Sequence, residues 1–192
     1  MEKKHIITIA GKLGSGKSST AKKVAQMLGY AHASTGDFMR AMAQERGISL
    51  DELSKIAESD DSIDIALDDH NRDIGKKENI VLDSRLGFHF VPQSFKVFLE
   101  LDPLVAAERI LNDAKVNPMR HKETIGGFNT AEQIAESITK RLQSERKRYQ
   151  ELYGIEDQTD PKNFDLVINT KEIPLEQVCK KVIEEYNKWI TE

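Results

Sequence analysis

The stretch that decides the fold spans residues 11–18 and reads Gly11-Lys12-Leu13-Gly14-Ser15-Gly16-Lys17-Ser18. It matches the pattern GxxxxGK[ST] of a phosphate-binding loop, called the P-loop below. The apolar residues 5–10 before it predict a buried strand, and residues 19–28 after it predict a helix. Glycines let backbone N–H groups close around phosphate oxygens, and the start of the helix faces the same anion. The order strand, loop, helix therefore predicts a nucleoside triphosphate site.

Two side chains at the end of this loop are predicted to handle the outer phosphates. Lys17 is a candidate catalytic residue because its ammonium can offset charge during phosphoryl transfer, and the Ser18 hydroxyl can ligate Mg²⁺. The expected cofactors are therefore ATP and Mg²⁺. The residues predicted to bind ATP are Gly11, Lys12, Leu13, Gly14, Ser15, Gly16, Lys17, Ser18 and Ser19.

The composition of the 192-residue chain is that of a globular protein with one well-packed domain. The formal net charge of −4 argues against a general nucleic-acid surface. The single cysteine, Cys179, excludes an intrachain disulfide and is typical of a reducing cytoplasm. No apolar run is long enough to cross a bilayer. We therefore expect a cytoplasmic monomer that binds small molecules and neither nucleic acid nor membrane.

Short apolar runs alternate with helical patterns along the rest of the chain. Further strands are predicted at 31–33, 79–83, 95–100 and 164–169. This alternation favours a parallel sheet that is covered by helices on both faces. We therefore predict an α/β fold of three layers, with a mostly parallel five-stranded sheet in a single domain over residues 1–192.

A helical insertion is predicted between the second and third strands, over about 35–76. Helical patterns occur there at 37–46, 50–58 and 62–75, without a strand signal between them. Ser49 followed by Glu52 is typical of a capping box at the start of the middle helix. We expect these helices to form a small subdomain at the edge of the sheet.

A mobile lid is predicted over about 113–129, between two long helical patterns. The segment is polar and contains Asn117-Pro118 and Gly126-Gly127, which break regular structure. The alternative is a plain surface loop. As a lid it would exclude water from the phosphates, and Arg120 is a candidate for its charged group.

A second anion site is predicted at the ends of two strands. Ser34-Thr35-Gly36-Asp37-Phe38-Met39-Arg40 follows the second strand, and Leu82-Asp83-Ser84-Arg85-Leu86 ends the third. Ligands of parallel sheets bind at the carboxyl ends of strands, so Arg40 and Arg85 should both face the P-loop and grip one phosphate. Asp83 is predicted to help hold Mg²⁺, the alternative being an aspartate that only forms a turn.

The absence of a guanine-binding motif after the later strands limits the functions that the triphosphate could serve. No guanine-reading tetrapeptide of the form Asn-Lys-x-Asp follows them, and residues 165–170 occupy that region instead. Motors and helicases are normally far larger than this chain. A phosphoryl donor to a small acceptor is therefore the favoured interpretation. A nucleotide-gated binding protein, whose hydrolysis times the release of a partner, is the alternative from another class.

The ordered set of motifs resembles nucleoside monophosphate kinases. Residues 34–40 resemble the monophosphate motif of adenylate kinases, and most of the chain is similar to short, archaeal-type cytidylate kinases. The segments that carry this similarity are 47–54, 83–86, 108–110, 147–149, 153–155 and 165–170. The resemblance implies a P-loop NTPase fold with an acceptor-binding insertion and a lid, and ATP-dependent phosphorylation of CMP or dCMP. Kinases of AMP, UMP or another small acceptor are the alternatives.

The resemblance also implies roles for the helix after the lid, where Arg141, Glu145 and Arg148 share one face. Similar enzymes carry Arg, Asp and Arg at this spacing to meet the acceptor's phosphate and ribose. Glu145 departs from that pattern, and a face of intrahelical salt bridges is the alternative. The acceptor-binding set is Ser34, Gly36, Asp37, Arg40, Asp83, Ser84, Arg85, Arg141 and Arg148. The catalytic set is Lys17, Arg85, Arg109 and Arg141.

Overall fold

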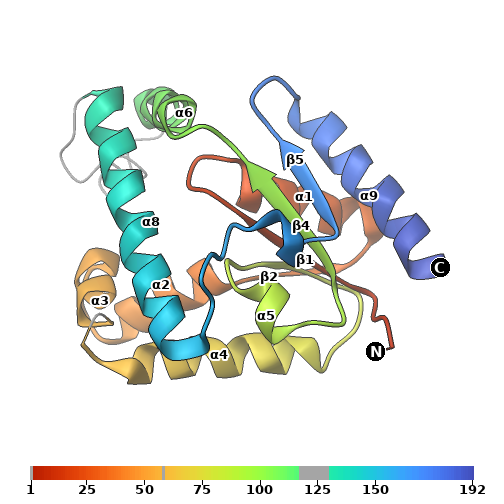
Figure 1. Ribbon diagram of the computed structural model, residues 1–192, viewed down its shortest axis with the longest axis horizontal. Coiled ribbons are helices and arrows are strands. Elements are labelled where there is room, and N and C mark those ends of the chain that lie inside the picture. Colours follow the sequence, from red (N-terminus) through yellow and green to blue (C-terminus); the bar gives the residue numbers. More distant parts are fainter. Residues whose placement is uncertain (1, 58, 117–129) are drawn as a thin grey trace.

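The computed structural model of the protein describes residues 2–57, 59–116 and 130–192. Five strands form one sheet in the order β2-β3-β1-β4-β5 (Figure 1). They are β1 (Ile6–Gly11), β2 (Ala31–Ser34), β3 (Ile80–Asp83), β4 (Phe95–Glu100) and β5 (Leu166–Asn169). All four strand pairings are parallel. The five predicted strands are therefore confirmed, with ends that move by one or two residues.

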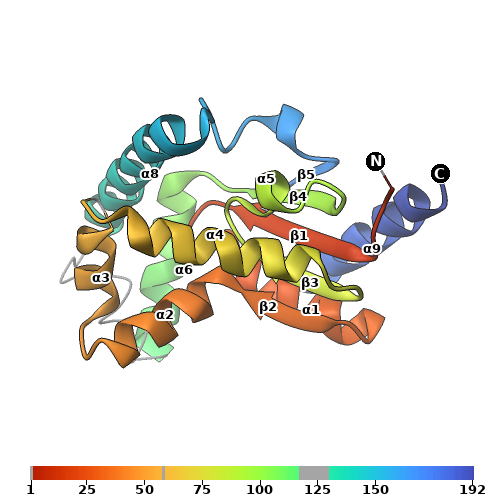
Figure 2. The same ribbon diagram turned by 90° about the horizontal axis from the view of Figure 1, so that it is seen from below.

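Successive side chains of a strand point to opposite sides, and every residue of β1 and β3 is buried, so these two strands are covered on both faces. Ile7 and Ile9 pack toward α1 (Lys17–Leu28) and α9 (Leu175–Thr191). Ile6 packs on the other face with Ile74 of α4 (Asp61–Gly75) and with Val91, which follows the short helix α5 (Gly87–Phe90). Figure 2 shows α4 and α5 on this side of the sheet from below. This arrangement confirms the predicted three layers, whereas α5 was absent from the prediction.

Three helices fill the range predicted for the helical insertion, namely α2 (Thr35–Glu45), α3 (Leu50–Ile56) and α4. The capping box at α3 is formed, since the Ser49 hydroxyl accepts a hydrogen bond from Glu52 N and the Glu52 carboxylate accepts one from Ser49 N. The three helices share a small core of their own. It consists of Ala43, Leu53, Ala57 and Ile63, with Met39, Met42, Ile48 and Leu67 packed against it.

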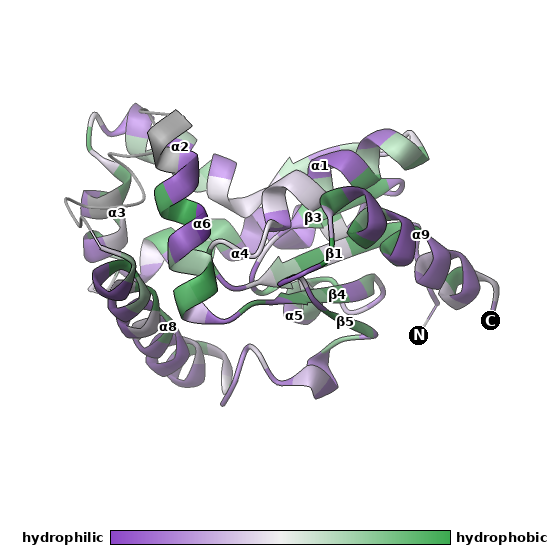
Figure 3. Ribbon diagram, turned by 90° about the horizontal axis from the view of Figure 1, so that it is seen from above, coloured by the Kyte–Doolittle hydropathy of each residue, from purple (hydrophilic) through white to green (hydrophobic). Residues whose placement is uncertain are grey.

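Two further helices extend from the end of the sheet that carries the P-loop. Helix α6 (Pro103–Val116) packs against α8 (Ala131–Tyr153) through buried residues such as Ala106, Ile110 and Ile138. Figure 3 shows that α8 is largely hydrophilic, in contrast to the apolar strands. Residues 117–129, with most of the predicted lid and Arg120, lie outside the described residues. No described helix combines the length and the apolar character needed to cross a bilayer.

Candidate active site

The P-loop connects β1 to α1 through three positions where the backbone requires glycine. Gly14 and Gly16 have φ angles of 75° and 88°, in the left-handed region. A Cβ atom on Gly11 would lie 2.5 Å from the carbonyl oxygen of Leu99, and one on Gly14 would lie 3.0 Å from Ala106. Helix α1 then begins at once, with no side chain capping its first N–H groups. These groups remain available to an anion, as the P-loop motif predicts.

The turn after β5 supports the loop from the neighbouring edge of the sheet. The buried Thr170 hydroxyl donates a hydrogen bond to the carbonyl oxygen of Ser15 at 3.2 Å. Arg109, on α6, donates to the carbonyl oxygens of Thr170 and Lys171 at 2.6 and 2.8 Å. Arg109 thus fixes this turn and does not line the cleft described next. Its catalytic role stays a prediction.

A cleft of about 680 Å³ opens beside the P-loop and is lined by the strand ends, α2, α3, α4 and α8. It collects predicted residues of the ATP side and of the acceptor side. These are Leu13, Lys17, Ser18, Ser34, Gly36, Arg40, Asp83, Ser84, Arg85, Arg141 and Arg148. Phosphoryl transfer requires two ligands to meet in one space, and this cleft offers such a space.

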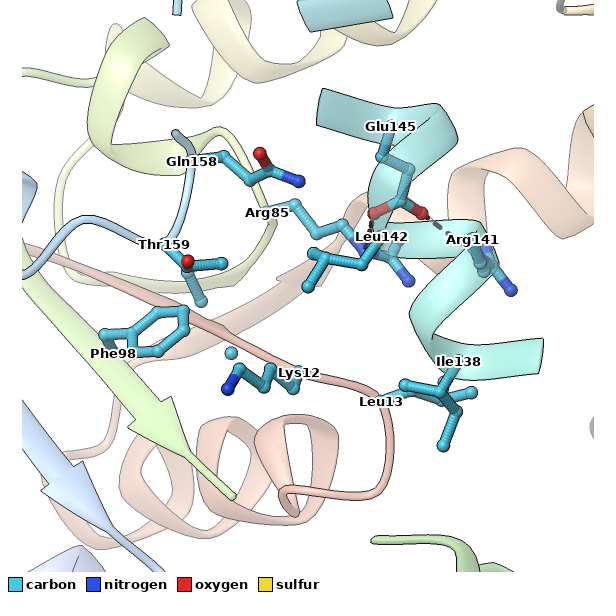
Figure 4. A pocket seen from close by; sticks show the side chains of 12 residues that line it. Lys12, Leu13, Arg85, Phe98, Ile138, Arg141, Leu142, Glu145, Gln158 and Thr159 are labelled. Carbon is cyan, nitrogen blue, oxygen red and sulfur yellow. Dashed lines mark hydrogen bonds and ion pairs between the residues drawn. The ribbon is translucent and has the colours of Figure 1, made fainter. Parts of the chain in front are cut away.

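A second hollow, of about 30 Å³, borders the first residues of the loop (Figure 4). Gly11, Lys12 and Leu13 line it, together with Phe98 and the buried Gln158. Its volume suits one or two water molecules and is too small for a nucleotide. The other predicted residues line neither space. They are Gly14, Ser15, Gly16, Ser19, Asp37 and Arg109.

The two predicted magnesium ligands lie in direct contact. The Ser18 hydroxyl donates a hydrogen bond of 2.5 Å to the Asp83 carboxylate. Parallel pairing of β1 with β3 places Asp83 opposite Ile9, two residues before the loop, and so brings the carboxylate to Ser18. Hydroxyl and carboxylate oxygens are the hard ligands that Mg²⁺ prefers, so this pair fits the ion.

The environment of Lys17 favours an anion. Burial, followed by the positive charge of Arg85, lowers the pKa of Lys17 to about 8, although Asp83 and Glu145 act in the opposite direction. An ammonium group in these surroundings gains from a phosphate placed beside it. Lys17 thus lines the cleft in surroundings that favour an anion, and its catalytic role stays a prediction.

Glu145 joins two of the predicted phosphate-binding arginines. Its carboxylate lies 3.2 Å from Nε of Arg85 and 3.0 Å from Nε of Arg141 (Figure 4). Burial opposes ionisation of Glu145, but Arg85 and Arg141 outweigh it, so the pKa of Glu145 is lowered. The residue that departs from the family pattern thus holds the two guanidinium groups together, and one of its ion pairs is the intrahelical salt bridge left open by the sequence.

The residues that follow β2 and β3 form the polar wall of the cleft near the loop. Ser34 caps α2 by accepting a hydrogen bond from Asp37 N, which explains why this helix begins two residues earlier than predicted. Arg40 is exposed and forms an ion pair with Asp37 one turn earlier. Ser84 is buried, and within the described residues its hydroxyl has no hydrogen-bond partner. Arg40 and Ser84 both line the cleft, and their binding of the acceptor stays a prediction.

Two buried carboxylates of α4 also line the cleft and were missed by the sequence analysis. Asp64 lies 3.2 Å from Nε of Arg148, and Asp68 accepts a hydrogen bond of 3.0 Å from the Tyr153 hydroxyl. Burial raises the pKa of Asp68 to about 6 and also raises that of Asp64. The spacing of four positions puts both carboxylates on one face of the helix, but nothing in the sequence showed that this face would be buried against α8.

Comparison with known proteins identifies the relatives of this chain. The profile of the cytidylate kinase-like family matches residues 6–172. A cytidylate kinase from Natronomonas pharaonis is 40% identical over 169 residues, covering 86% of this chain and 80% of that protein. One from Methanosphaera stadtmanae is 35% identical, covering 93% and 98%. An S-adenosylmethionine-dependent nucleotide dehydratase from Lacinutrix mariniflava is 32% identical over 95% of this chain, which spans only 36% of that protein.

Solved structures show the same fold at low sequence identity. Shikimate kinase from Bacteroides thetaiotaomicron has a TM-score of 0.62 at 15% identity, covering 97% of this chain and 98% of that one. A gluconokinase from Sinorhizobium meliloti has a TM-score of 0.58 at 16% identity, covering 100% and 96%. These likenesses confirm the predicted fold of P-loop kinases. With the family profile and the two relatives above, they place this chain in the cytidylate kinase-like family.

Proposed function

We propose that the protein transfers the γ-phosphoryl group of ATP to CMP or dCMP, giving CDP or dCDP. The observation that carries this proposal is the shared cleft. Lys17 and the Ser18–Asp83 pair border it on the loop side. Arg85 and Arg141 border it on the side of α8, held together by a common carboxylate. The relatives named cytidylate kinase supply the choice of acceptor.

The chemistry needs positioning and charge compensation more than proton transfer. An acceptor phosphate is already ionised at neutral pH, so its oxygen can attack the γ-phosphorus without a general base. Arg40, Arg85 and Arg141 would orient that phosphate through forked hydrogen bonds, while Lys17 offsets the charge on the transferred group. Bound Mg²⁺ would neutralise charge on the outer phosphates, with Ser18 and Asp83 as its protein ligands.

Three features complete the proposal. We assign acceptor binding to the insertion over about 35–76 and closure to a lid over about 113–129. A closed lid would keep water from accepting the phosphoryl group. The protein would act as a monomer.

The decisive experiment is a coupled assay of ADP release with CMP, dCMP, UMP, AMP and GMP as acceptors. We expect kcat/KM for CMP or dCMP to exceed that for UMP and AMP by at least about 100-fold, because mismatched buried polar groups are costly. A preference for AMP or UMP would refute the acceptor and leave the kinase class standing. Slow hydrolysis of ATP at a rate that no monophosphate changes would instead favour the nucleotide-gated binding protein.

A further inference from the structure

The cleft contains a second charged pair, formed by Asp64 of α4 and Arg148 of α8. It lies beyond Arg85 and Arg141, the arginines proposed to bind the acceptor phosphate. Arg148 follows Arg141 by seven residues on the same helical face, which corresponds to a rise of about 10 Å. Asp64 faces Arg148 from α4 across the cleft. A nucleotide whose phosphate lies at Arg85 and Arg141 and which extends along α8 would bring its base toward this pair.

The pair has hydrogen-bonding capacity that the protein does not use. Asp64 is 4% exposed, and its Oδ2 atom lies 3.2 Å from Nε of Arg148. This contact is an ion pair without hydrogen-bond geometry, and within the described part of the chain neither atom has another hydrogen-bond partner. Both of these atoms are buried, so a ligand would meet the pair through the parts of the two side chains that line the cleft. A ligand with matching donors and acceptors there would gain affinity and specificity, because mismatched buried polar groups are costly.

We propose that Asp64 and Arg148 read the base of the acceptor nucleotide. Asp64 would accept a hydrogen bond from the exocyclic amino group of cytosine, and Arg148 would donate to its ring nitrogen and carbonyl oxygen. This assignment rests on the proposed function, because it presumes a nucleotide acceptor in the cleft.

The chemistry of the pair distinguishes the two pyrimidines. Uracil presents a carbonyl oxygen where cytosine has its amino group, and this oxygen would face the Asp64 carboxylate. Its ring N–H would face the Arg148 guanidinium, so two of the three contacts would be mismatched. Met39 and Leu67 also line the cleft and offer apolar surface for the face of the ring.

The test is the variant Asp64→Asn, assayed with CMP and UMP. The amide keeps the size of the side chain but can present either an acceptor or a donor, so it no longer separates an amino group from a carbonyl. We expect the CMP/UMP ratio of kcat/KM to fall by at least about tenfold. Inhibition by ribose 5-phosphate, which has no base, should stay unchanged. If thermal melting shows that this variant does not fold, Arg148→Gln is assayed in the same way.

Asp69→Asn is the matched control, because Asp69 is exposed on the same helix and pairs with Arg72 at 3.0 Å. Its ratio should equal that of the wild type. If the CMP/UMP ratio of kcat/KM in Asp64→Asn stays within about threefold of the wild-type ratio, the inference is overturned. The proposal that CMP is the substrate would still stand. An equal loss of ribose 5-phosphate inhibition would also overturn the inference, because Asp64 would then shape the phosphate site. Failure of the wild type to phosphorylate CMP would refute the proposed function itself.

Discussion

Removing the charge of Glu145 tests whether one carboxylate holds the two arginines of the site. Glu145→Gln keeps the shape of the side chain but leaves Arg85 and Arg141 without their shared counter-charge. Lys17 also loses a nearby negative charge that favours its ammonium form. Three positive groups would then face one another around the cleft, and the folded state should be destabilised.

The magnitude follows from the burial of the partners. Breaking a fully buried ion pair by removing one partner costs about 3–5 kcal/mol. The Arg85 and Arg141 side chains are 31% and 44% exposed, so water screens part of the uncompensated charge. We therefore expect the free energy of unfolding to fall by roughly 2–3 kcal/mol. For a chain of this size, that corresponds to a thermal midpoint lower by roughly 4–12 °C.

Urea denaturation followed by circular dichroism measures this loss. Glu151→Gln is the matched control, since Glu151 lies on the same helix and its exposed pair with Lys147 is 3.9 Å long. The control should change the free energy of unfolding by less than about 0.5 kcal/mol. Inorganic phosphate should stabilise Glu145→Gln more than the wild type, because it replaces the missing negative charge. A loss no larger than that of the control would refute the bridging role.

Four further predictions concern the P-loop and the arginines of the cleft. Lys17→Ala should lower kcat by about 100-fold or more in the coupled assay while the thermal midpoint holds. Because the pKa of Lys17 is lowered to about 8, calorimetry should show ATP affinity falling as pH rises through 8, and this dependence should vanish in Lys17→Ala. Arg40→Ala and Arg85→Ala should each lower kcat/KM for the monophosphate by about 30- to 1,000-fold with ATP affinity kept; the reverse pattern would contradict the division of the cleft. Gly11→Ala should lower the thermal midpoint, since its Cβ would lie 2.5 Å from the Leu99 carbonyl oxygen.

The sheet and the P-loop were predictable because their signals are local. Each strand is a short apolar run between breakers, and the loop is defined by consecutive residues such as Gly16 and Lys17. The register of parallel strands then brings Asp83 to Ser18, so this contact followed once the strand ends were assigned. The helix α5 was missed because its single turn, Gly87–Phe90, is too short to show a period.

The partners of charged side chains were less predictable, since they depend on how distant helices pack. The helical spacing of Arg141 and Arg148 identified one face of α8, but nothing local showed that α4 would set Asp64 against it. The hydrogen bond from Arg109 to the carbonyl oxygen of Thr170 likewise joins residues that lie 61 positions apart. Such contacts arise only when the tertiary structure has formed.

The unbroken helix α8 imposes a rule on how this chain can change over evolution. Its residues that line the cleft run from Ile134 to Tyr153 within one continuous α-helix. Deleting or adding one residue between Arg141 and Arg148 would rotate the rest of the helix by about 100°. The side chains beyond the change, Arg148 among them, would then point away from the cleft. A substitution on α8 changes the contacts of one side chain, whereas a change in its length would displace every residue beyond that point. Insertions and deletions among descendants should therefore accumulate outside residues 134–153.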